Sequence, residues 1–143
     1  MIVAVRRFLR CQRGSEFVEA AVTIPIVVLV MLAIVQFGLV VYASQMASEA
    51  ARHGVRWGAV AQANQAGIAA SQAAGFASTA LPVGNPQVSV LAPGGVLGSN
   101  IKLQVSYDVP NFLGGLAGLF PGLPSGPFHV TGEASMRQEG WLQ

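Results

Sequence analysis

The sequence predicts an α+β protein: a long N-terminal transmembrane helix that continues outside the membrane, then a second helix and a small antiparallel β-sheet. Three observations support this fold class. An uncharged apolar run covers residues 20–41, an Ala- and Gln-rich stretch follows it, and the last third of the chain alternates between apolar and polar residues. With 143 residues, of which 52% are hydrophobic and 10% charged, the chain is too apolar for an ordinary soluble domain.

The membrane segment is predicted from its length and from the charges beside it. Residues 20–41 contain no ionisable side chain, and at ~1.5 Å per residue they extend roughly 33 Å, enough to cross a bilayer core. Four arginines precede the run, at positions 6, 7, 10 and 13. The positive-inside rule therefore predicts a cytoplasmic N-terminus and an extracytoplasmic C-terminal domain. Pro25 lies inside the run, where we expect it to kink or loosen the first turns of the helix.

Helical spacing continues beyond the membrane. Gln45, Glu49 and Arg56 fall on one polar face, with Arg52 or His53 between them. The opposite face carries a stripe of very small residues: Ala43, Ala47, Ala50, Ala51, Gly54 and Gly58. Such a stripe lets another helix approach closely. A second helix is predicted within residues 62–81, and the sequence leaves open whether the stripe packs against it or against another subunit.

After Pro82 the pattern changes to the two-residue period of β-strands. Strands are predicted at residues 87–91, 101–109 and 128–139, and the second has five apolar residues alternating with polar ones. A loop of residues 110–127 separates the last two. It is broken by Gly and Pro, yet it carries six large apolar residues: Phe112, Leu113, Leu116, Leu119, Phe120 and Leu123. We expect these side chains to be buried against a partner protein or the outer membrane leaflet, or else folded back onto the sheet.

Composition and spacing also exclude several functions. The net charge of +2 comes from the arginine-rich start, and the rest of the chain is mildly acidic, which disfavours nucleic-acid binding. Cys11 is the one cysteine in the sequence. His53 and His129 have no partners at metal-ligand spacing, and no nucleophile elbow or phosphate loop is present. We therefore expect no enzymatic activity, metal, cofactor or small-molecule substrate.

Glu19 has an unusual position, because its carboxylate comes directly before the apolar run. A carboxylate at the centre of a membrane helix costs about 2.5 to 3.5 kcal/mol, and less at its edge, unless it is hydrated or paired with a cation. Glu19 could reach the headgroups, where an acid near a helix N-terminus is favourable. The other possibility is a cationic partner.

The order of these features resembles a known signal. A short basic leader ending in Gly14, then Ser15, a glutamate five residues after the glycine and an apolar helix is similar to the class III signal of type IV pilins. The whole chain resembles the TadE family of minor pilins and pseudopilins from tight-adherence (Tad/Flp) systems. The resemblance lies in "RRFLRCQRGSEFVEAAVTIPIVVLVMLAIVQFGLVVYASQMASEAARHGVR" at the start and in "IKLQVSYDV" and "FHVTGEASMRQEG" near the end. Glu16 departs from the pattern, because many relatives carry a small apolar residue there.

The resemblance implies that a prepilin peptidase cuts between Gly14 and Ser15, and that Glu19 pairs with the new N-terminus of a neighbouring subunit. The resemblance also implies a division of the chain into three parts. Residues 1–14 would be the leader, residues 15–61 the transmembrane helix with its extracytoplasmic extension, and residues 62–143 an α+β domain. The protein would be a non-enzymatic subunit in the bacterial inner membrane or a surface pilus used in cell adhesion, with other pilins or pseudopilins as partners. The alternative function is an uncleaved, single-pass adaptor that docks a partner through its apolar loop.

Overall fold

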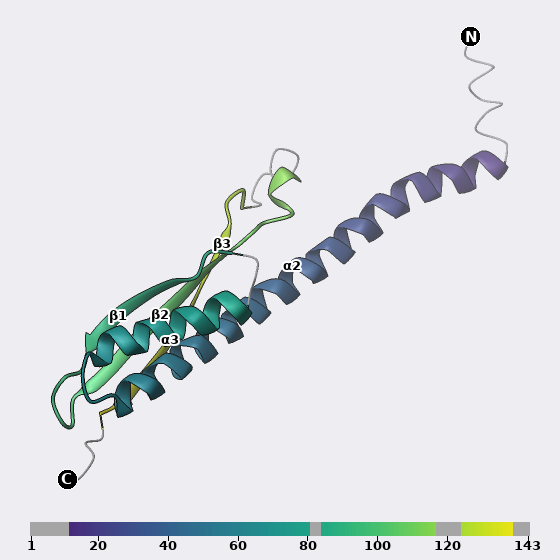
Figure 1. Ribbon diagram of the computed structural model, residues 1–143. Coiled ribbons are helices and arrows are strands. Elements are labelled where there is room, and N and C mark those ends of the chain that lie inside the picture. Colours follow the sequence, from purple (N-terminus) through teal and green to yellow (C-terminus); the bar gives the residue numbers. More distant parts are fainter. Residues whose placement is uncertain (1–11, 81–83, 117–123, 139–143) are drawn as a thin grey trace. The chain divides into compact units, whose positions relative to one another are not determined.

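The computed structural model describes residues 12–80, 84–116 and 124–138 (Figure 1). Its elements are helix α2 (Gln12–Val60), helix α3 (Gln65–Ala80), strand β1 (Gln87–Pro93), strand β2 (Asn100–Val109), the 3-10 turn η1 (Gly114–Leu116) and strand β3 (Phe128–Arg137). A long apolar N-terminal helix, a second helix and a three-stranded antiparallel sheet confirm the predicted α+β class. The chain divides into two compact units, Met1–Val35 and Gln36–Gln143.

The first unit contains the N-terminal part of α2. The helix is continuous through Pro25. By length and composition, α2 is the one helix among the described residues that could cross a membrane. Almost every side chain from position 16 to position 35 is exposed, including large apolar ones such as Phe17 and Ile34. This part of α2 therefore carries a large exposed apolar surface.

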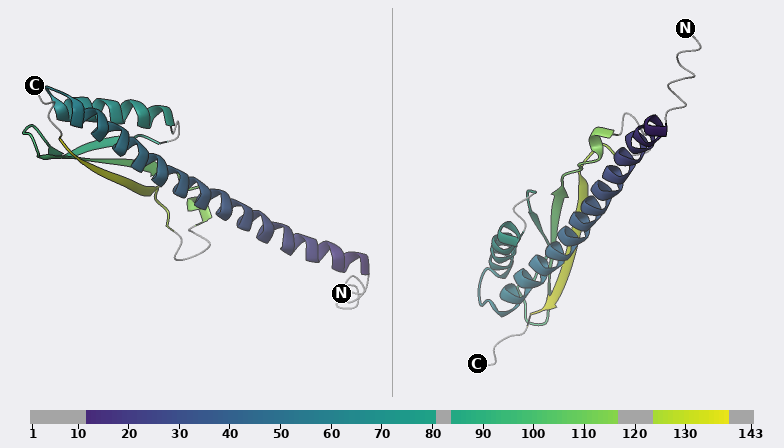
Figure 2. Two further views of the ribbon diagram at one scale, coloured as in Figure 1. Left: turned by 90° about the horizontal axis from the view of Figure 1, so that it is seen from below. Right: turned by 90° about the vertical axis from the view of Figure 1, so that its right-hand side faces the viewer.

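The second unit is a sheet with helices on one face, as Figure 2 shows for α3 and the later part of α2. The strand order is β1-β2-β3, and both pairs are antiparallel. The side chains of β2 that face the helices are fully or almost fully buried: Ile101, Leu103, Val105, Tyr107 and Val109. Polar residues occupy the other face, where Lys102 forms an ion pair with Glu133 at 2.7 Å. The two-residue period of the sequence thus predicted which face of β2 is buried.

The small-residue stripe of α2 packs within the chain. All six of its members are buried. A Cβ atom added to Gly54 would lie 2.7 Å from the Cβ of Ala73, and one added to Gly58 would lie 2.7 Å from the Cβ of Ala69. Both alanines belong to α3. At Gly54 and Gly58 the stripe therefore packs against α3 of the same chain, which is one of the two possibilities left by the sequence.

Tyr107 links the sheet to α3, and its hydroxyl donates a 2.8 Å hydrogen bond to the carbonyl of Ala77. Burial, and secondarily the phenol of Tyr42, raises the pKa of Tyr107 above its usual 10.0. The neutral phenol is thus favoured in the folded protein. The stability it contributes is present below pH ~10 and is lost as the pH rises through the raised pKa.

We predict that Tyr107→Phe lowers the free energy of unfolding by about 1 to 3 kcal/mol, because the buried Ala77 carbonyl loses its donor. The variant should also lose the part of the alkaline destabilisation that Tyr107 causes. Thermal unfolding of the full chain in mild detergent, followed by near-UV circular dichroism from pH 8 upward, measures both effects. An unchanged midpoint at pH 8 would show that the hydrogen bond contributes nothing.

Candidate functional site

The predicted cleavage residues lie at the beginning of α2. Gly14 and Ser15 have helical backbone, two and three residues after the first residue of the helix. A protease needs an extended backbone at the bond that it cuts, so this first turn must unwind before cleavage. Glycine makes that easier, because it is about 1 kcal/mol less favourable than alanine in a helix. The cleavage itself stays a prediction.

Glu19 lies one turn further along α2, and its side chain is exposed. It is four residues after Ser15, so the two residues share one face of the helix. Among the residues that the structure describes, none forms a hydrogen bond or an ion pair with Glu19. The neighbouring Phe17 is 78% exposed and Val18 is 61% exposed. The exposed carboxylate of Glu19 therefore lies beside another exposed acid, Glu16, and close to large exposed apolar side chains.

The apolar loop is described only in part. Phe112 is 55% exposed, Leu113 is half-buried, and the backbone of Leu116 ends the short turn η1. Leu119, Phe120 and Leu123 lie outside the described residues. The structure therefore leaves the predicted interface of these six residues untested.

Sequence reasoning missed Gln36, which holds this loop to α2. Gln36 is only 4% exposed. Its Nε2 donates to the carbonyl of Pro110 at 3.1 Å, and its Oε1 accepts from the backbone N–H of Phe112 at 2.9 Å. One side chain thus satisfies two backbone groups of the loop. The available signal was its position, because Gln36 is the one amide side chain in the uncharged run of residues 20–41.

Asn111 organises the same loop from within. Its Nδ2 donates to the carbonyls of Pro124 and Gly126, at 2.5 and 3.2 Å, and its Oδ1 accepts from the N–H of Leu113 at 3.0 Å. These bonds hold together the two ends of the connection between β2 and β3. Gln36 and Asn111 therefore fix where the loop leaves and re-enters the domain.

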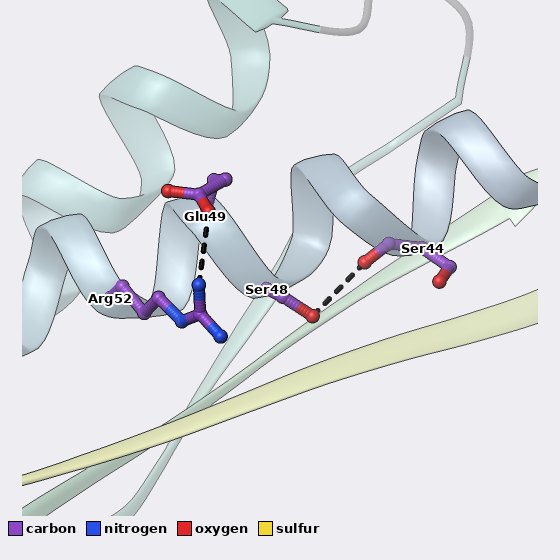
Figure 3. Close-up of polar contacts among 4 residues, drawn as sticks. All are labelled: Ser44, Ser48, Glu49 and Arg52. Atoms are coloured by element: carbon purple, nitrogen blue, oxygen red, sulfur yellow. Dashed lines mark hydrogen bonds and ion pairs between the residues drawn. The ribbon is translucent and has the colours of Figure 1, made fainter.

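The polar face of α2 has the character of a solvated surface. In Figure 3, Arg52 donates to Glu49 at 3.1 Å, and the Ser48 hydroxyl donates to the carbonyl of Ser44, also at 3.1 Å. More than half of each side chain in the Glu49–Arg52 pair is exposed, and such pairs contribute about 0 to 1 kcal/mol. In the described ranges, no three His, Cys, Asp or Glu side chains come together as metal ligands.

Comparison with known proteins identifies the N-terminal part of the chain. A family model described as TadE-like protein matches residues 14–56. The match begins at Gly14 and includes Glu19, the apolar run and most of the small-residue stripe. No curated protein and no solved structure matches the chain. Over residues 14–56, the chain is therefore similar to the TadE-like protein family.

Proposed function

We propose that the protein is a pilin-like subunit of a Tad/Flp type IV pilus or secretion machine, made as a single-pass membrane protein and cut after Gly14 by a prepilin peptidase. The observation that carries this proposal is the TadE-like match over residues 14–56, a segment that holds the Gly14–Ser15 junction, Glu19 and the exposed apolar helix together. The role is structural, and no step of it requires a catalytic residue.

The exposed apolar side chains of the first unit are suited to burial in lipid or against other apolar helices. Among them, Phe17 is 78%, Ile34 is 67% and Met31 is 63% exposed. Burial of each such side chain is worth about 1.5 to 3 kcal/mol. Lipid provides the cover for a membrane-anchored subunit, and the apolar helices of neighbouring subunits provide it in a filament. The same surface thus serves both states.

Glu19 makes assembly depend on cleavage. Before cleavage, the four leader arginines hold the N-terminus in the cytoplasm. After cleavage, those charges are gone and Ser15 carries a free amine. A carboxylate that enters an apolar helix bundle is costly unless it is paired. We infer that Glu19 of one subunit pairs with the Ser15 amine of its neighbour, so that unprocessed chains cannot join.

The Glu19→Gln variant tests this role. We expect it to be inserted and processed as the unmodified chain is, but to lose most of its crosslinking to other pilins of the system, because the amide cannot neutralise the amine. Glu16→Gln is the matched control, since Glu16 is also exposed on the same helix turn. It should crosslink normally. Normal crosslinking of Glu19→Gln would contradict the pairing, and equal losses in both variants would indicate a general charge effect.

A further inference from the structure

The hydrogen bonds of Gln36 fix the position of the apolar loop relative to the part of α2 that begins at Gln36. Gln36 belongs to the same compact unit as the loop, and it lies inside the uncharged run of residues 20–41. Tyr42, the first residue after the run, is of a type enriched at membrane–water boundaries. Gln36 precedes Tyr42 by six residues, or roughly 9 Å along the helix. With Tyr42 at the headgroups, the start of the loop would lie below that level, because Gln36 holds it.

The backbone of this loop is suited to a place with little water. The N–H of Phe112 is bonded to Gln36, and the N–H groups of Leu113 and Gly114 are bonded to the side chain and the carbonyl of Asn111. Irregular backbone can enter a membrane boundary only where such groups are satisfied within the protein. Both polar atoms of the Gln36 amide also form hydrogen bonds, because its nitrogen donates to the carbonyl of Pro110 and its oxygen accepts from the N–H of Phe112.

The side chains here also favour lipid over water. Phe112 is 55% exposed, and Phe37, the residue next to Gln36, is 71% exposed. Residues 109–128 contain no ionisable side chain. The ionisable side chains nearest in sequence are those of Asp108 and His129, and these two side chains contact each other. An apolar, uncharged surface thus continues from the helix onto the beginning of the loop.

We propose that residues 110–113 dip into the leaflet through which α2 leaves the membrane, where Phe112 and Leu113 contact lipid acyl chains near the headgroups. Gln36 is the positioning residue that holds them there. A depth of about 5 to 10 Å is typical of protein segments that lie in this boundary region. The inference rests on the membrane anchoring proposed above. It gives the extracytoplasmic domain a second membrane contact, besides the helix.

The test is a fluorescence measurement on the full chain in vesicles of phosphatidylethanolamine and phosphatidylglycerol. Cys11 is replaced by alanine, and an NBD fluorophore is attached to a single cysteine at position 112, 37 or 76. Phe76 of α3 is the matched aromatic control, at 37% exposure. We expect the labels at 112 and 37 to be quenched by nitroxide lipids and protected from iodide, and the label at 76 to show the reverse.

The outcomes separate this inference from the anchoring on which it rests. If the label at 37 is quenched by lipid but the label at 112 is quenched by iodide, the loop contact is wrong while the anchor stands. If neither label is quenched by lipid, α2 leaves the membrane before position 37 and the loop contact is wrong, while the anchor through residues 16–35 still stands. Protection of the label at 112 that appears only when other pilins are added would identify a protein surface, and would also overturn the lipid contact.

Gln36→Leu tests the positioning role. The substitution removes the donor and the acceptor that hold Pro110 and Phe112, while keeping the run apolar. We expect the label at 112 to lose its lipid quenching and the label at 37 to keep it. Gln45→Leu is the control, because Gln45 is exposed on the same helix. Unchanged quenching at 112 in Gln36→Leu would overturn the role of Gln36.

Discussion

Replacing Gly132 by alanine is expected to destabilise the second unit strongly, because the added methyl group has no room. A Cβ at this position in β3 would lie 2.2 Å from the backbone nitrogen of Ser48 and 2.4 Å from the carbonyl carbon of Ala47. Both atoms belong to the backbone of α2, so no side chain can rotate away to make room. The helix and the strand would have to separate, which exposes the core between them.

We expect the loss to be at least about 3 kcal/mol, the upper end for overpacked cores, against a total stability of about 5 to 15 kcal/mol for a typical domain. Thermal unfolding of the full chain in mild detergent measures it. Gly75→Ala in α3 is the matched control, because a Cβ there meets nothing within 4 Å. That variant should be stabilised by about 0.5 to 1 kcal/mol. A wild-type midpoint for Gly132→Ala would show that helix and strand are not in contact there.

Gly132 also shows where reasoning from the sequence stops. The alternation of β3 places position 132 on the inward face, between Val130 and Ala134. Alternation identifies the face but not the element that covers it. The need for glycine arises from the closeness of two backbones that are far apart in the sequence, and periodicity does not report such distances. Met136 is a similar case: it is on the predicted inner face but is 42% exposed, near the end of an edge strand.

The elements themselves were predictable because each has a strong period or a clear boundary. The second helix and the third strand lie within the expected ranges, and strands β1 and β2 overlap theirs but extend one or two residues beyond them. The first and last residues of the elements differ more from the predicted ones. Helix α2 begins at Gln12, whereas the apolar run begins at position 20. The two limits differ because charged side chains are unfavourable inside a membrane but can be accommodated in a helix. Strand β1 continues to Pro93 through a bulge between Val90 and Ala92, an irregularity that its sequence pattern does not indicate.

The candidate site was predictable to a different extent in each part. The Gly14–Ser15 junction and Glu19 could be recognised because they lie close together in the sequence, in a fixed order before an apolar run. Gln36 could not be assigned a role in this way. Its partners, Pro110 and Phe112, are 74 and 76 residues away. A lone amide in a membrane run indicates that a partner exists, but only the fold shows which groups it binds.

The largest functional effect is expected from Gly14→Leu, which should abolish processing by the prepilin peptidase. Leucine adds bulk at the bond to be cut, and it is a much better helix former than glycine, so it also resists unwinding of the first turn of α2. Gly14→Ala separates the two causes, because alanine stabilises the helix with little added bulk. Gly38→Leu is the control for the same change elsewhere in α2, where a Cβ meets nothing within 4 Å.

The measurement is the intact mass of the protein recovered from its native membrane. The unmodified chain and Gly38→Leu should begin at Ser15, and Gly14→Leu should keep its leader and still be inserted, because the arginines and the apolar run are unchanged. Partial processing of Gly14→Ala would assign the block to helix stability as well as to bulk. If the unmodified chain keeps its leader while an active peptidase is present, the pilin proposal fails. The protein would then be the uncleaved, membrane-anchored adaptor, and Glu19 would have no amine on Ser15 to bind.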